Sequence, residues 1–187
     1  MEAVMDTPPI PVDSTKKIEI SRATNEKSFM FARYIVTLGK NLVEQSARYA
    51  KKDINIDDGQ THAMTFDFPP DSEIGQSISV LMPKKEPNAN PSSLKIAYKA
   101  ISGEPRAEIQ IQSNNGLSIK FTHQSAENSE DASIQCEALN DSVDVTDENI
   151  LQKLKDSMMM MQVSLVKNVE NLPIPKPTTQ SAQRKAA

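Results

Sequence analysis

Apolar and polar residues alternate in a series of short segments between residues 17 and 138. Apolar positions two residues apart are typical of a β-strand with one buried face. The clearest pair of segments lies on either side of Asn114-Asn115-Gly116, which is typical of a hairpin turn. Because polar residues fill the intervening positions, one sheet face should meet water, which favours antiparallel pairing. The predicted strands are Lys17–Ile20, Met64–Phe68, Ile78–Met82, Leu94–Ala100, Ile109–Ile111, Leu117–Phe121 and Ile134–Ala138.

The segment from residue 22 to about residue 52 has the 3.6-residue period of an amphipathic helix. We expect Ser21 or Thr24 to cap its N-terminus. Gly39 lies between two apolar stripes, and close approach of another helix would explain a glycine there. Together the two stripes cover so wide an arc of the helix surface that the helix must contact more than one neighbouring element. The stripes are Phe31, Ile35, Leu38, Leu42 and Tyr49, and Phe29, Val36, Val43, Ala47 and Ala50.

A second long helix is predicted to begin near Thr146 and to end before Pro173. Its main apolar stripe should face the core, and it consists of Ile150, Leu154, Met158, Met161, Leu165, Val169 and Leu172. A smaller stripe on another side consists of Met159, Val163 and Val166. The second stripe is expected to be buried either inside the monomer or against another chain.

These patterns predict an α+β fold, in which an antiparallel meander of five to six strands is flanked by long N-terminal and C-terminal amphipathic helices. We expect the sheet to lie between the two helices. A chain of 187 residues has the size of one domain. The predicted boundaries are a flexible arm over residues 1–15, a single domain over 16–173, and a flexible, Pro-containing, basic tail over 174–187.

Charge and cysteine content narrow the class of protein. A single cysteine, Cys136, excludes an intramolecular disulfide, and the sequence shows neither a secretory leader nor an apolar stretch of membrane-spanning length. We therefore expect a cytoplasmic protein. Residues 22–52 hold seven basic and two acidic residues, whereas residues 121–152 hold eight acidic and no basic residues. These two segments should attract each other in the fold or across an oligomer contact, or provide a docking surface for a charged partner.

No motif in the sequence predicts catalysis, a metal site or a cofactor. The segment from Asp53 to Gly59 is superficially similar to a calcium loop, but its glycine is one position late and Met64 stands where a carboxylate is needed. Cys136 lies in the apolar register of its strand, which favours a buried thiol over a nucleophile. The glycines are too far apart for a phosphate loop. We therefore expect no cofactor, no metal and no enzymatic activity.

The sequence favours a non-catalytic protein-binding module, an adaptor or chaperone-like component of a protein complex. The partner would be another protein chain, in a homo- or hetero-oligomer. The alternative is a helix-grip-like carrier that encloses a small hydrophobic ligand. Nucleic-acid binding is disfavoured by a pI near 5.3 and by the absence of interleaved aromatic residues. The residues expected to bind the partner are Met159, Val163, Val166, Phe29, Val36, Val43, Arg33 and Lys40.

Overall fold

The computed structural model describes residues 15–81, 90–101, 106–123, 132–139, 143–167 and 174–177. The elements in this part of the chain are β1 (Thr15–Ser21), α1 (Glu26–Tyr49), β2 (Thr61–Asp67), α2 (Glu73–Ser79), β3 (Ser93–Ile101), β4 (Arg106–Ser113), β5 (Ser118–His123), β6 (Ser133–Leu139), α3 (Glu148–Lys167) and β7 (Ile174–Pro177). The strands form one antiparallel sheet in the order β1-β6-β5-β4-β3-β2-β7. The predicted α+β class is confirmed, and β2 to β6 form the expected meander.

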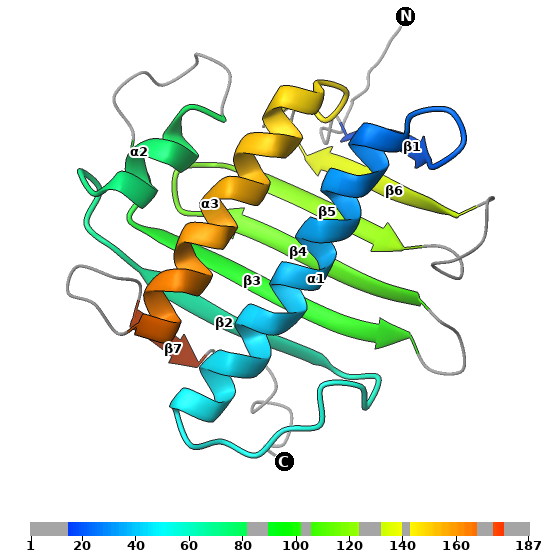
Figure 1. The fold of residues 1–187 in the computed structure, drawn as a ribbon. Coiled ribbons are helices and arrows are strands. Elements are labelled where there is room, and N and C mark those ends of the chain that lie inside the picture. Colours follow the sequence, from blue (N-terminus) through cyan, green and yellow to red (C-terminus); the bar gives the residue numbers. More distant parts are fainter. Residues whose placement is uncertain are drawn as a thin grey trace, which may run out of the picture.

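Both long helices lie side by side over the same face of the sheet (Figure 1). The expectation that the sheet lies between them is therefore wrong, although both helices do flank it. Helix α1 approaches all seven strands, whereas α3 lies against α1 and α2. The reason is the alternation within each strand, because only one sheet face is apolar enough to bury a helix. On the opposite face, polar side chains such as Gln110, Lys120 and Gln135 remain partly exposed.

Gly39 allows α1 to lie close to the centre of the sheet. A Cβ atom at Gly39 would be 1.6 Å from Ile109 Cδ1 and 3.6 Å from Ile96 Cγ2. The predicted close approach is thus to the sheet and not to another helix. Val36 and Val43 lie three residues before and four residues after Gly39, so they share its side of the helix and are buried.

The segment containing Ile78 is helical, which corrects its prediction as a strand. Ser72 caps α2, because its side-chain oxygen accepts a hydrogen bond from the Gly75 N–H at 3.2 Å. Ile74 and Ile78, four residues apart, are both buried, as expected for one face of a helix. A short apolar run fits both the two-residue period of a strand and the 3.6-residue period of a helix. Here the Ser72 cap favours the helix.

The structure also specifies one helix cap and one further strand. Asn25 is the residue that caps α1, with its Oδ1 accepting from the Ser28 N–H at 3.2 Å, in place of Ser21 or Thr24. Residues 174–177, at the start of the predicted tail, form β7 and pair with β2 at the edge of the sheet. Proline lacks an N–H, and strands containing proline are confined to sheet edges. Residues 1–14 and 178–187 of the predicted arm and tail lie outside the described residues.

The core lies between the sheet and the helix pair. Its largest fully buried side chains are Phe29, Phe66, Phe121, Ile35, Leu42, Ile78, Leu81, Leu94, Ile96, Ile109, Ile111 and Leu117. Cys136 is also buried there, as its place in the apolar register predicts. Within the described residues, none of the helices has the length and apolar character needed to cross a membrane.

Candidate functional site

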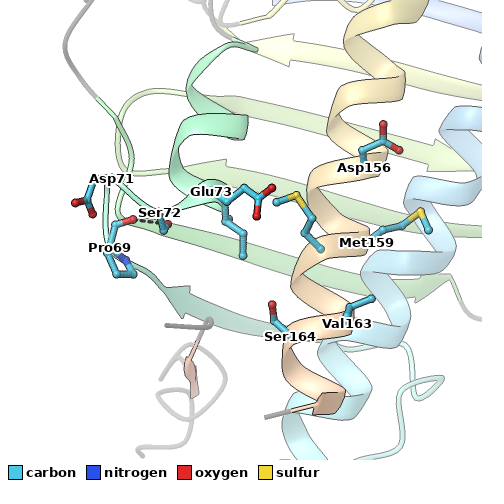
Figure 2. A pocket seen from close by; sticks show the side chains of 10 residues that line it. Pro69, Asp71, Ser72, Glu73, Asp156, Met159, Val163 and Ser164 are labelled. Atoms are coloured by element: carbon cyan, nitrogen blue, oxygen red, sulfur yellow. Dashed lines mark hydrogen bonds between the residues drawn. The ribbon is translucent and has the colours of Figure 1, made fainter. Parts of the chain in front are cut away.

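A hollow of about 900 Å³ lies between α3 and the segment that leads into α2 (Figure 2). Its apolar lining comes from both sides, with Ile74 on α2 and Met159, Met160 and Val163 on α3. The remaining lining residues are Pro69, Asp71, Ser72, Glu73, Asp156 and Ser164. The lining of the hollow therefore combines apolar and polar residues.

A second hollow of about 480 Å³ lies between α1 and α3. It is lined by Met30, Arg33, Tyr34, Thr37, Leu38, Asn41, Met159, Gln162 and Val163. Met159 and Val163 line both hollows, so these two side chains form a ridge between them. Both side chains are exposed, and Figure 2 shows them on the α1 side of α3.

Four large apolar side chains on this side are exposed. The exposed fractions are 44% for Met30, 49% for Tyr34, 37% for Met159 and 51% for Val163. We call these four residues the helix-pair patch. Scattered apolar residues are ordinary on a protein surface, but a group that borders two hollows is typical of an interaction site.

The backbone around Ser72 fixes the α2 side of the larger hollow. Ser72 Oγ donates to the Pro69 carbonyl at 2.5 Å and accepts from the Gly75 N–H. A Cβ atom at Gly75 would be 2.6 Å from the Pro70 carbonyl oxygen, so a side chain there would force this turn apart. Ile74 anchors α2 in the core. The position of α2 is therefore set by local hydrogen bonds and by burial together.

The charged residues that line the larger hollow are all acidic. Its lining includes the carboxylates of Asp71, Glu73 and Asp156 and no basic residue. Figure 2 shows Glu73 pointing from α2 toward α3. Lys155 lies on the other side of Asp156, with its Nζ atom 3.2 Å from Asp156 Oδ1 and 5.7 Å from the centre of the Tyr34 ring. The site therefore has a negative α2 side and a cation near its α1 side.

The structure separates the sequence-predicted partner residues into distinct places. Met159 and Val163 are exposed on the ridge, and Arg33 lines the smaller hollow. Lys40 lies elsewhere, 3.7 Å from Asp57 and 6.0 Å from the centre of the Tyr98 ring. The side chain of Val166 is outside the described residues.

The predicted partner residues Phe29, Val36 and Val43 are buried within the chain. These side chains are 0%, 8% and 0% exposed, because they pack on the sheet. These three residues are among those expected from the sequence to bind a partner, whereas the core of the chain itself covers them. The sequence alone could not show which side of a two-striped helix the sheet would cover.

Two parts of the site are not predicted by the sequence patterns described above. Met30 and Tyr34 lie four residues apart outside both predicted stripes, and that spacing was a usable signal for an additional apolar strip on the helix. The larger hollow does not follow from the sequence, because the alternation at Ile78–Met82 predicts a strand there. Without α2 as a helix, Ile74 and Glu73 had no reason to be placed beside α3.

Other reactive groups lie outside this site. Burial raises the pKa of the Cys136 thiol, with a smaller effect from the charge of Glu137, so the thiol stays protonated. His62 Nε2 lies 2.8 Å from Asp58 Oδ1. Desolvation alone would raise the pKa of Asp58, but hydrogen bonds from the Gln60 N–H and His62 outweigh it and lower the pKa. Among the described residues, no group of three or more His, Cys, Asp or Glu side chains is arranged to hold a metal ion.

The space between the helices and the sheet bears on the ligand-carrier alternative. At Gly39, α1 lies directly against Ile109 of the sheet. Both hollows are on the outer side of the helix pair, where α3 meets α1 and α2.

Comparison of the chain with protein-family models, curated proteins and solved structures gave no match in any of the three.

Proposed function

We propose that this protein is a non-catalytic protein-binding module that takes up a basic amphipathic segment of another protein on its helix-pair patch. The observation that carries the proposal is the ridge of Met159 and Val163, exposed between two hollows. A helix that lays its apolar face into such a groove would cover the ridge and fill the hollows. This activity fits an adaptor or chaperone-like component.

The apolar part of the site supports binding of partner side chains. Met159 and Met160 line the larger hollow, and methionine is unbranched and polarizable, so it repacks around partners of different shape. Burial of an exposed side chain such as Val163 on binding would contribute roughly 25 cal/mol for each Å² removed from water. Binding energy is therefore expected to be concentrated at Met159 and Val163.

The charged residues of the lining support a basic partner. Asp71, Glu73 and Asp156 line the larger hollow, and of these Asp156 is paired with Lys155, which lies outside the lining. Complementary charge at the rim of an interface speeds association and selects among partners, and salt weakens it. An amphipathic helix with lysines beside its apolar face would match both the apolar lining and the acidic residues of the site.

A designed peptide tests the proposal directly. The probe is a fluorescein-labelled helix of about five turns with leucine at positions i, i+3, i+4 and i+7 and lysine on its polar face. Its counterpart has glutamate in place of lysine, and a scrambled lysine peptide controls for charge alone. We expect saturable binding of the lysine helix by fluorescence anisotropy, weaker at high salt, and little binding of the other two peptides.

Substitutions test whether the peptide binds at the helix-pair patch. The double variant Met159→Gln and Val163→Thr keeps side-chain shape and should weaken binding at least about tenfold, because it removes the apolar anchors. Val80→Thr is the matched control, since Val80 is 57% exposed and lies outside both hollows. Glu73→Lys should weaken binding of the lysine helix and improve binding of the glutamate helix. The proposal is wrong if the lysine and glutamate peptides bind equally, or if the double variant binds like the Val80→Thr control.

A further inference from the structure

The two edges of the sheet differ in their capacity to accept another strand. At one edge, β7 contains Pro175 and Pro177, which lack N–H groups and, two residues apart, remove donors from the same side of the strand. At the other edge, β1 runs for seven residues without proline and pairs only with β6 among the described strands. Unpaired edges of this kind template further pairing unless they are blocked.

The β1 sequence is self-complementary. When two copies pair antiparallel with Ile18 opposite Ile18 of the second copy, Lys17 lies opposite Glu19 of the second copy, and the reverse pair forms as well. A register centred on Lys17 or on Glu19 instead places like charges opposite each other, which is destabilising. Only the register centred on Ile18 therefore pairs opposite charges at both positions.

The outer sheet face already alternates in charge across the neighbouring strands. Lys120 of β5 is opposite Glu137 of β6, and Glu137 is opposite Lys17 of β1. The next position in this row, beyond the edge, would be Glu19 of the second copy. Both Lys17 and Glu19 are exposed, and Glu19 is held on this face by a 2.8 Å hydrogen bond from Ser133 Oγ.

We propose that two copies of the chain associate through their β1 edges, antiparallel, with a two-fold axis at Ile18, to form one continuous sheet. Ile18, which is partly buried against the core, would contact Ile18 of the second copy on the apolar side. Lys17 and Glu19 would form two symmetric ion pairs on the polar side. This surface is separate from the helix-pair patch, and the inference does not rest on the proposed function.

Sedimentation equilibrium of the full chain tests the inference over a range of concentrations. The wild type should be a reversible dimer. Glu19→Lys alone, or Lys17→Glu alone, places like charges at both pairs, so the dissociation constant should rise at least about tenfold. An equimolar mixture of the two variants should form a heterodimer, because one copy then has lysine at both positions 17 and 19 and the other has glutamate at both.

A matched charge change and a folding measurement serve as controls for the β1 interface. Lys52→Glu changes an exposed charge after α1 and should leave the dimer intact. Circular dichroism should show that both charge variants remain folded. A wild type that is monomeric at all concentrations overturns the inference, and so does a dimer that survives both charge changes. It is also overturned if the Met159→Gln and Val163→Thr variant is monomeric while Lys17→Glu still dimerises, since the contact is then the helix-pair patch.

Discussion

Ser77 of α2 and Ser157 of α3 share a hydrogen bond, with 2.5 Å between their Oγ atoms. Ser157 is fully buried and donates its hydroxyl proton to the Lys153 carbonyl at 2.9 Å. Since a hydroxyl has one proton, Ser157 must accept from Ser77, which completes a relay from α2 into the backbone of α3. This relay fixes α2 against α3 and so helps to set the shape of the larger hollow.

Replacing Ser157, the buried member of this hydrogen-bonded relay, should destabilise the protein. Ser157→Ala leaves the Ser77 hydroxyl without its acceptor, and we expect a loss of about 1–2 kcal/mol in the free energy of unfolding. Urea denaturation followed by circular dichroism measures it. The double variant Ser77→Ala and Ser157→Ala should lose less than the sum of the single losses, because no hydroxyl is left unpaired. Strictly additive effects would show that the two side chains do not interact.

Filling Gly39 should also destabilise the fold. Alanine favours a helix by about 1 kcal/mol over glycine. However, its Cβ would overlap Ile109 Cδ1 at 1.6 Å, and overpacking costs about 1–3 kcal/mol. We therefore expect Gly39→Ala to lower the thermal unfolding midpoint. Adding Ile109→Val removes the Cδ1 atom and should recover much of that loss. Thr37→Ala, on the exposed side of α1, is the control and should not lower the midpoint.

The Asp58 carboxylate should contribute to acid sensitivity. Its pKa in the folded protein is lower than its ordinary value of 3.8, because the hydrogen bonds from Gln60 and His62 favour the charged form over the effect of desolvation. The unfolded chain therefore takes up this proton first as pH falls. The stabilisation is fully present above pH 3.8 and is lost as pH falls through the folded-state pKa.

Comparison with Asp58→Asn measures that contribution. The difference in unfolding free energy between wild type and variant should be larger near neutral pH than below about pH 3, where the charge is lost on about nine in ten free carboxyl groups. A matched variant is Asp57→Asn, which removes a neighbouring carboxylate and leaves the His62 contact in place. If the Asp58→Asn difference is the same at both pH values, the hydrogen-bonded carboxylate does not stabilise the fold.

The sequence determined the local elements of this protein. Alternation placed β2 to β6, with the exception of the segment that became α2, and Asn114-Asn115-Gly116 marked the hairpin, where Gly116 has φ 110°. Helical periodicity likewise located α1 and α3 and singled out Met159 and Val163 as apolar positions away from the main stripe of α3. These signals are readable because side-chain direction follows directly from backbone period.

Tertiary structure decided the rest. Which stripe of α1 is covered depends on where the sheet lies, and Gly39 brings the Phe29, Val36 and Val43 side onto it. Ile174–Pro177 becomes a strand only because β2 offers it an edge. Likewise, the ridge of Met159 and Val163 borders two hollows only because α1 and α2 lie on either side of α3. A periodic pattern states which residues share a face, whereas contacts between distant segments decide what that face meets.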